Sequence, residues 1–512
     1  MIPIPYDRLI SQSPETESNK EEGVTINVLL LASPDVQHDF DFVARIPNLG
    51  ITSIAGNIND VCDVKIADLN VTKDPHKFVR KTIKRYHIDL VGLSCMSFQY
   101  RGMLEIAKIV KEYNGVQVVF GGYHPTLEYK EIGESPDIEY IDFITRGEGE
   151  ATFRELIQAI PDQRYEGVLG LSYKENGRML HNPPRPLLDL ADIRLPDRGA
   201  RLLKKGFYGF THPVDVVETS RGCTQGCKFC SINHMYGRSF RTYSIDRVIE
   251  DIQDAKDHGA QNIFFVDDNI TLNTNRMKRL CEAIIDAGLD DIYYQTQAST
   301  SGIAKSKEVV DLMAKAGFDG VFLGIENALP RNIEFFGKTG MATDSEKAVK
   351  YLHEHRIIVS GGIISGNPDD TREDVLRNLE LAKKLKLDVP IFYIMTPYPK
   401  TEIREELINM GLVTNPGDVT KYDGIYANVK TKHLSTDELQ YLVWKMNIDY
   451  YNLEWYRSNN IIRRYPKWYL KRTLELIPKY LKRRLQVALG LKTERDFYHE
   501  DMKTGVLCKG GV

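Results

Sequence analysis

Short apolar segments alternate with amphipathic helical segments in two separate stretches of this chain, and this alternation limits the fold more than any other feature of the sequence. Apolar runs with few charges, separated by segments of helical spacing, are typical of parallel strands joined by helices. In the first stretch the strand candidates are residues 25–33, 63–70, 90–97, 116–122 and 143–150. We therefore expect a doubly wound, Rossmann-like α/β sheet over residues 24–160.

The alternation resumes at residue 214 and continues to residue 415. The strand candidates of this second stretch are residues 214–220, 262–268, 291–299, 320–327, 357–368 and 389–401, with helical segments between them. Repeated strand–helix units close most readily into a barrel, so we expect a partial, TIM-like (β/α)6 barrel here.

The other segments connect or extend these two domains. Residues 1–23 are polar and without periodicity, which indicates a flexible leader. Residues 161–213 predict a linker, with a hairpin turning at Asn176-Gly177 and a proline-rich stretch after it. Residues 416–512 predict a helical C-terminal region that contains a basic and aromatic tract. A chain of 512 residues is also too long for one ordinary core.

Overall composition narrows the class of protein. The net charge of −4 argues against a general nucleic-acid binder, and no uncharged apolar run is long enough to span a membrane. The N-terminus has no signal-peptide pattern, and the few scattered cysteines do not form a disulfide framework, so we expect a cytoplasmic protein. Four cysteines occur singly: we expect Cys62, Cys95 and Cys281 to be packed thiols and Cys508 to lie in a disordered tail.

The other three cysteines, Cys223, Cys227 and Cys230, occur together in one glycine-containing loop. Thiolates are soft ligands that select iron–sulfur clusters, zinc or copper(I). Structural zinc needs a fourth ligand, and the nearest candidate, His234, stands at an unusual spacing from Cys230. The spacing therefore favours a four-iron cluster on three cysteines, which leaves one iron free to bind a small molecule.

This C-x3-C-x2-C motif, with the aromatic Phe229 before its last cysteine, resembles the signature of radical SAM enzymes. The resemblance covers residues 214–410, and further stretches match the family in the same order. Residues 265–269 resemble its second strand, Glu326 ends the fourth, and residues 362–368 match the G-x-I-x-G segment that cradles adenine.

The last match, residues 397–401, resembles the family's P-x-P-G-T segment, but Lys400 replaces the usual glycine. The resemblance implies a [4Fe-4S] cluster on the three cysteines and S-adenosylmethionine (SAM) on the open iron. Reductive cleavage of SAM would then release a 5′-deoxyadenosyl radical that removes hydrogen from an unactivated substrate carbon. The SAM-binding residues that it implies are Phe229, Gln297, Glu326, Gly362, Ile364 and Gly366. Of the rim carboxylates Asp267 and Asp268, we expect at least one to be structural.

The first domain resembles the cobalamin-binding domain of the cobalamin-dependent radical SAM class, which contains methyltransferases and anaerobic cyclases. The resemblance lies in LVGLSCMSF, VVFGGYHPT and FITRGEGEATFREL, which precede the barrel in this order, and small residues at strand ends would let a flat corrin lie on the sheet edge. A D-x-H-x-x-G motif is absent, and Asp35 and His38 have the wrong spacing, so we expect no histidine ligand to cobalt. The implied cobalamin-binding residues are Ser94, Ser97, Gly121, Gly122, His124 and Glu148.

The class implies methyl transfer from methylcobalamin to a carbon, and SINHMYGRSFRT and FFVDDN resemble branches that act on hopanoid and other apolar lipids. Radical cyclisation or oxidation, as in the anaerobic ring-forming cyclases, is the alternative within the class. A non-catalytic cobalamin or redox sensor is an alternative outside it. The resemblance also implies an electron donor such as flavodoxin or ferredoxin.

Residues 457–484 combine many Lys and Arg residues with interleaved Trp and Tyr. Such a tract suits a lipid interface, so peripheral membrane docking to reach an apolar substrate is one interpretation. A solvated basic cap packed by its aromatic residues is an equally favoured one. Nucleic acid is a third and weaker interpretation, because the rest of the chain is acidic.

Overall fold

The computed structural model describes residues 26–34, 43–338, 341–451 and 453–504. The predicted leader (residues 1–23), Asp35, His38 and the tail that contains Cys508 lie outside the described residues.

The first domain contains the predicted parallel sheet, whose strand order is β3-β1-β4-β5-β6. The order reverses next to β1, as it does in doubly wound sheets, and each strand pairs in parallel with its neighbours. The strands are β1 (Asn27–Ala32), β3 (Asp63–Asp68), β4 (Leu90–Ser94), β5 (Gln117–Gly121) and β6 (Phe143–Thr145). The predicted fold of this domain is therefore confirmed.

Helices cover both faces of this sheet because successive strand side chains point to opposite sides. Leu29 and Leu31 of β1 pack in one apolar cluster with α2 and α3, whereas Val28 and Leu30 pack in another with α1 and α6. The helices are α1 (Leu49–Ile58), α2 (Pro75–Tyr86), α3 (Tyr100–Val110), α4 (Tyr123–Leu127), α5 (Tyr129–Glu134) and α6 (Gly149–Ala159).

The hairpin predicted around Asn176 and Gly177 is present, as β7 (Leu171–Glu175) and β8 (Arg178–His181). Both turn residues have positive φ, 49° and 77°, which a two-residue type I′ turn requires. The hairpin joins the first sheet through antiparallel pairing of β7 with β6. The sheet thus extends to His181, beyond the expected end of the first domain at residue 160.

The rest of the linker is held by polar contacts with both domains. A two-stranded antiparallel pair, β2 (Ala44–Arg45) with β9 (Tyr208–Gly209), joins the end of the linker to the segment between β1 and α1 of the first domain. Arg198 is fully buried and forms ion pairs with Asp251 (2.7 Å), Asp254 (2.7 Å) and Asp215 (3.3 Å). The proline-rich stretch is therefore firmly attached to the rest of the protein.

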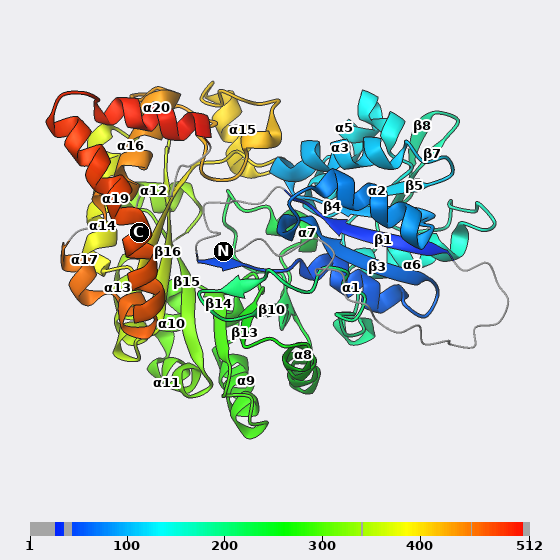
Figure 1. Cartoon of the computed structure of the whole chain (residues 1–512), viewed down its shortest axis with the longest axis horizontal. Coiled ribbons are helices and arrows are strands. Elements are labelled where there is room, and N and C mark those ends of the chain that lie inside the picture. The colour runs from blue at the N-terminus through cyan, green and yellow to red at the C-terminus, as the bar shows by residue number, and fades with distance from the viewer. Residues whose placement is uncertain (1–25, 35–42, 339–340, 452, 505–512) are drawn as a thin grey trace.

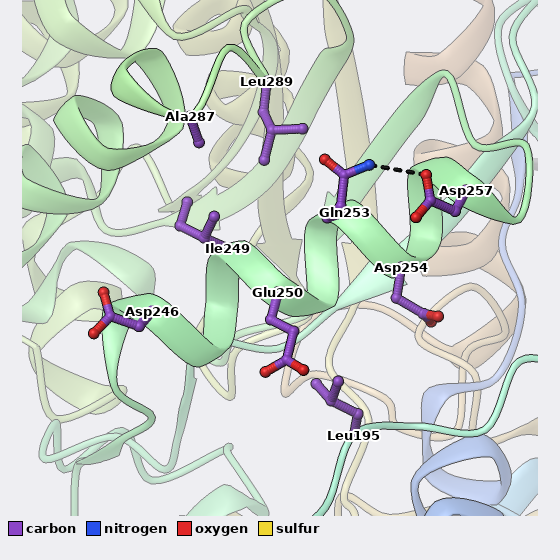
Figure 2. A pocket seen from close by; sticks show the side chains of 9 residues that line it. All are labelled: Leu195, Asp246, Ile249, Glu250, Gln253, Asp254, Asp257, Ala287 and Leu289. Carbon is purple, nitrogen blue, oxygen red and sulfur yellow. Dashed lines mark hydrogen bonds between the residues drawn. The ribbon is translucent and has the colours of Figure 1, made fainter.

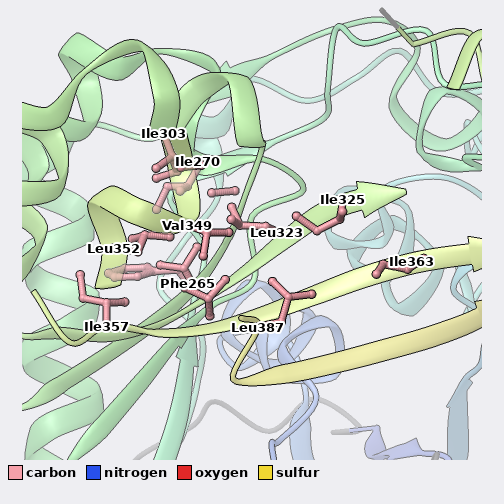
Figure 3. Packing of buried hydrophobic residues seen from close by; sticks show 14 of the residues in the cluster. Phe265, Ile270, Ile303, Leu323, Ile325, Val349, Leu352, Ile357, Ile363 and Leu387 are labelled. Atoms are coloured by element: carbon pink, nitrogen blue, oxygen red, sulfur yellow. The ribbon is translucent and has the colours of Figure 1, made fainter. Parts of the chain in front are cut away.

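The second domain is the predicted partial barrel, one parallel sheet of order β10-β13-β14-β15-β16-β17. Its strands are β10 (Val214–Val217), β13 (Asn262–Phe265), β14 (Tyr293–Ala298), β15 (Phe318–Glu326), β16 (Ile358–Ser365) and β17 (Val389–Ile394). Phe265, Leu323 and Ile363 from the strands pack against Leu352 and other helical residues in one continuous core (Figure 3). The covering helices are α8 (Ile245–Asp257), α9 (Thr274–Asp286), α10 (Thr300–Lys305), α11 (Lys307–Lys315), α12 (Pro330–Phe335), α13 (Met341–Glu354), α14 (Arg372–Leu385) and α15 (Glu402–Asn409).

The C-terminal region is helical, as predicted, and covers the flank of the barrel that faces away from the first domain (Figure 1). Trp455 and Tyr465 anchor it: the Trp455 indole donates to the Asp388 carbonyl at 3.0 Å, and the buried Tyr465 hydroxyl bonds to Asp319. The helices are α16 (Thr436–Asp449), α17 (Leu453–Ser458), α18 (Asn460–Arg464), α19 (Pro466–Ala488) and α20 (Glu494–Thr504). No described helix, α19 included, has both the length and the apolar composition that a membrane span requires.

Candidate active site

The cysteine loop lies directly after the first barrel strand, at the carboxyl edge where barrel enzymes place their chemistry. Cys223, Cys227 and Cys230 fall between β11 (Ser220–Arg221) and α7 (Ile232–Tyr236), and all three are unpaired and half-buried. The loop begins at Gly222, whose φ is +86° and where a Cβ would approach the Ser239 carbonyl oxygen to 2.4 Å. Only glycine fits there, which explains why one precedes the first cysteine.

Contacts from later segments of the barrel domain hold this loop. The Lys228 N–H donates to the Phe336 carbonyl at 3.0 Å, and the Lys228 ammonium pairs with Glu406 of α15 at 2.7 Å. The ring of Phe229 packs edge-on against that of Phe336, with 5.4 Å between their centroids. The aromatic residue of the motif thus fixes the loop between its last two cysteines.

The donor set fits an iron–sulfur cluster. Within the described residues, no three His, Cys, Asp or Glu side chains come close enough together to bind a single metal ion. A four-iron cluster occupies more space than one ion, so its thiolates surround a volume and do not converge on one point. His234, the candidate fourth ligand for zinc, has an exposed side chain on α7.

The predicted SAM residue Glu326 ends β15 in a strained conformation. Its φ is +68°, in the left-handed region, and the pairing of β15 with β16 shifts register at this point. Such strain in a non-glycine residue is typical of functional sites. The buried Glu326 carboxylate forms an ion pair with Lys338, whose ammonium lies 5.7 Å from the centre of the Phe229 ring. Lys338 was not predicted from the sequence.

Two glycines of the predicted adenine segment lie where neighbours leave no room for a side chain. A Cβ at Gly362, in β16, would lie 2.7 Å from the Phe322 ring. Gly366, just after the strand, has a φ of +96° and would place a Cβ 2.8 Å from Leu439. The buried Oδ1 of Asn367 has no hydrogen-bond partner, so a polar acceptor is available beside this backbone. These features fit a nucleoside held against backbone.

The remaining predicted SAM residues lie on neighbouring strands. Ile364, in β16, accepts a hydrogen bond on its carbonyl from the Asn327 amide at 2.7 Å. Gln297 lies near the end of β14 and is half-buried. The structure therefore brings residues of β14, β15 and β16 to the same edge as the cysteine loop.

The two rim carboxylates have different environments. Asp267 is fully buried and accepts hydrogen bonds from Thr219 and Ser220, which indicates a structural role. Asp268 accepts a hydrogen bond from the Gly222 N–H at 2.8 Å, so it supports the start of the cysteine loop. Burial raises the pKa of Asp268 to about 6.

The predicted cobalamin residues lie along the carboxyl edge of the first sheet. Ser94 ends β4 and Gly121 ends β5. A Cβ at Gly121 would lie 2.7 Å from the Thr145 hydroxyl, and one at Gly122, whose φ is +94°, would lie 2.8 Å from the Cys95 carbonyl oxygen. Packing within this edge therefore requires glycine at both positions, and neither position carries a side chain.

His124 and Glu148, also predicted to bind cobalamin, have protein partners. The buried His124 ring lies 3.2 Å from the hydroxyl of Ser97 and packs on Tyr100, and burial lowers its pKa to about 4. Glu148 pairs with Arg221 at 2.9 Å and with Arg241 at 2.8 Å, both from the barrel domain. Glu148 thus contributes to the contact between the two domains.

Arg221 is the centre of that contact, two residues before Cys223. Its buried guanidinium also pairs with Glu150 of the first domain at 2.7 Å and with Glu218 of the barrel at 2.8 Å. Burial acts to raise the pKa of Glu150, but the charge and hydrogen bond of Arg221 outweigh it and the pKa is lowered. The sequence indicated no pairing between these distant residues.

A separate depression of about 490 Å³ lies on the outer side of α8 (Figure 2). Asp246, Glu250 and Asp257 line it, and no residue of the cysteine loop or of the glycine segment does. It belongs to the helical exterior of the barrel and not to the candidate active site.

Comparison with protein families agrees with this geometry. Residues 217–381 match the model of the radical SAM superfamily, and residues 41–157 match that of the B12 binding domain. A curated relative from Pyrococcus horikoshii, described as an uncharacterized methyltransferase, is 36% identical over 410 residues, which cover 79% of this chain and 88% of the relative.

More distant relatives have two kinds of activity. The hopanoid C-3 methylase of Methylococcus capsulatus is 28% identical and the match covers 70% of this chain and 68% of the relative. The anaerobic magnesium-protoporphyrin IX monomethyl ester cyclase of Cereibacter sphaeroides is 24% identical, with 83% and 68% covered. Among solved structures, the radical SAM methyltransferase TsrM from Kitasatospora setae, with cobalamin and a [4Fe-4S] cluster bound, has the same fold, with a TM-score of 0.62, 19% identity and 77% of each chain covered.

Proposed function

Because the chain belongs to the cobalamin-dependent radical SAM enzymes, we propose that it methylates an unactivated carbon of an apolar small-molecule substrate. One observation carries the proposal: the cysteine loop and the glycine edge of the first sheet lie next to each other. Helix α4 begins at Tyr123, directly after Gly122, and packs against α7, the helix after Cys230. Figure 1 shows α7 between the two sheets.

When bound, the cluster, SAM and cobalamin supply a 5′-deoxyadenosyl radical and a transferable methyl group. In this proposal Cys223, Cys227 and Cys230 hold the cluster. Lys338 compensates the charge of Glu326 and keeps that carboxylate beside the cysteine loop, where it would accept a hydrogen bond from the amino group of SAM.

Three phenols lie near the cysteine loop. Tyr123 and Tyr398 are close enough to Cys230 to be influenced by its charge, Tyr236 belongs to the helix that follows Cys230, and burial raises the pKa of all three. They therefore stay neutral, and their rings shield the space in which a radical would react. We assign them no role as radical carriers.

Methylation is favoured over ring formation because the 36% identical relative, which the match covers over 88% of its length, is described as a methyltransferase. The cyclase relative supports oxidation or cyclisation as the second candidate. All of these relatives are named as enzymes, which argues against the sensor hypothesis. An apolar substrate is supported by the hopanoid methylase, whose name specifies a lipid.

Two partners belong to the same proposal. Cleavage of SAM needs single electrons, so we propose a small flavin or iron–sulfur protein, such as flavodoxin or ferredoxin, as the donor. An apolar substrate would also bring the enzyme to a membrane surface, and residues 457–484 are the region that we propose for that contact.

The proposal is tested with reconstituted protein, a chemical reductant, cobalamin and methyl-labelled SAM under anaerobic conditions. Extract from a strain that lacks the gene is added, and the products are partitioned between organic solvent and water. Label in the organic phase supports methylation of an apolar substrate, whereas label in water keeps methylation and contradicts the apolar substrate. Extract-dependent 5′-deoxyadenosine without labelled product would favour cyclisation or oxidation.

Cys227→Ala should abolish cleavage of SAM in this assay but leave cobalamin bound to the first domain. Cys281→Ala is the matched control, because Cys281 is a buried thiol of α9 and does not belong to the cysteine loop. Unchanged cleavage by Cys227→Ala would show that the cluster assignment is wrong.

A further inference from the structure

Helix α19 presents an uncovered apolar stripe along its outer face. Five large side chains of this stripe recur at the three- and four-residue spacing of one helix face and are between 44% and 64% exposed: Leu470, Leu474, Ile477, Leu481 and Leu485. Folded proteins rarely leave so regular an apolar face open unless it binds something.

Positive charge is concentrated on the same segment. Residues 457–484 contain ten Lys and Arg residues against the single acid Glu475, a net charge of +9, so the other residues of this −4 chain together carry −13. Lys471 and Lys482 border the stripe on one side and Arg484 on the other, by helical spacing. Within the described residues, Lys471 and Lys482 have no acidic partner.

The opposite face of α19 is firmly attached to the protein. Tyr469 is buried and packs against Trp455 of α17, and Arg483 forms an ion pair with Asp501 of α20. The stripe is therefore held outward by the fold. Figure 1 shows α19 on the flank opposite the first domain, so a partner bound there leaves the contact between the two domains accessible.

We propose that this face of α19 binds the surface of an anionic phospholipid bilayer. A convex helix with apolar residues in the middle and cations at its borders matches the acyl chains and phosphates of an interface. A second copy of the chain is a poorer partner, because it would bring two segments of net charge +9 together. This inference rests on the membrane contact proposed above for residues 457–484 and names its lipid class and contact residues, and it does not depend on which reaction the enzyme catalyses.

The test uses the full chain, because Ile461, Tyr465 and Tyr469 are core residues and truncation at residue 457 would remove them. Protein is sedimented with vesicles of phosphatidylcholine alone or with about one-third phosphatidylglycerol. Wild type should sediment with the anionic vesicles only, and salt should weaken this binding. Leu474→Gln with Leu481→Gln should lower the vesicle partition coefficient by about tenfold or more.

Leu180→Gln is the matched control, because Leu180 is an exposed leucine, 38% accessible, on the hairpin of the first sheet. It should bind vesicles like wild type, and all variants should retain SAM cleavage in solution. Equal binding by wild type and the double variant, or no binding by wild type, would overturn the proposal. So would a wild-type dimer that the double variant converts to a monomer, because the stripe would then be a contact between copies.

Discussion

At the scale of single residues, the sequence predicts a cobalamin contact for His124 but gives no sign of its burial. His124 lies at the carboxyl edge of the first sheet with Ser97 and Tyr100 around its ring, and burial lowers its pKa to about 4 from an ordinary value near 6.5. The folded first domain therefore holds this imidazole neutral, whereas the unfolded chain protonates it as the pH falls.

His124 predicts a loss of stability on acidification. Its stabilising contribution is complete above about pH 6.5 and is lost as the pH falls towards about 4, a change of roughly 3 kcal/mol in the free energy of unfolding. His124→Gln should lose less stability than wild type between about pH 7 and about pH 5, measured by chemical denaturation without cobalamin. His76→Gln, at an exposed position of the same domain, is the control and should behave as wild type. Parallel curves for wild type and His124→Gln would contradict the prediction.

The candidate site was predictable where a residue belongs to a motif with fixed spacing. The three cysteines, Glu326 and the glycines of residues 362–366 lie at one sheet edge because strand ends place them there. Lys338 was not predictable, because its partner Glu326 is close to it only through the fold, and no periodicity marks it. For the same reason the sequence indicated a cobalamin contact for Glu148 but no pairing with Arg221.

At the scale of elements, the loop after β17 departs from the family pattern and contacts the first domain through the residue that differs. Lys400, in place of the usual glycine, has a φ of +65°, which costs a non-glycine residue about 1 kcal/mol. Its ammonium reaches the first domain and pairs with Glu131 at 2.6 Å and Glu128 at 3.5 Å. The strained lysine thus links the barrel mouth to α5.

Lys400→Gly should relieve the backbone strain and remove this link. The thermal stability of the barrel should be unchanged or higher, whereas bound cobalamin should dissociate about two to five times faster at low salt, since exposed ion pairs are worth below about 1 kcal/mol each. The difference should disappear at high salt. Absorbance of released cobalamin measures the rate.

Lys386→Gly is the matched control for that experiment. Lys386 also has a positive φ, 56°, but its ammonium lies 3.8 Å from Glu454 within the second half of the chain. It should raise stability without a change in cobalamin release. Faster release from Lys386→Gly, or equal release from Lys400→Gly and wild type, would show that the interdomain pairs do not hold the cofactor.

At the scale of the whole molecule, the number of parallel strands in each of the two sheets was predictable from alternation alone, whereas the two antiparallel strands that extend the first sheet were assigned to the linker. The attachment of the two domains was not predictable, because it depends on isolated charged residues that meet only after folding. Arg198 is an example: in a proline-rich stretch it has no helical or strand periodicity, yet it is fully buried among Asp215, Asp251 and Asp254.

Arg198→Met should destabilise the whole protein, because it leaves these acids without their buried cation. Removing one partner of a buried ion pair costs about 3–5 kcal/mol, and the freed linker should become sensitive to limited proteolysis. Arg194→Met is the comparison: its half-exposed side chain pairs with Asp60, and the cost should stay below about 1 kcal/mol. Equal resistance of both variants to protease would refute a structural role for Arg198.

Arg221 of the barrel is buried against Glu148 and Glu150 of the first domain, so each domain depends on charged residues of the other. A chimaera that joined this barrel to the first domain of a relative without these acids would leave the buried Arg221, two residues before Cys223, with Glu218 as the one remaining member of its three acidic partners. The error would appear in assembly of the cluster loop, far from the fusion point. Recombination within this lineage should therefore succeed only when the arginine and its two glutamates are exchanged as a set.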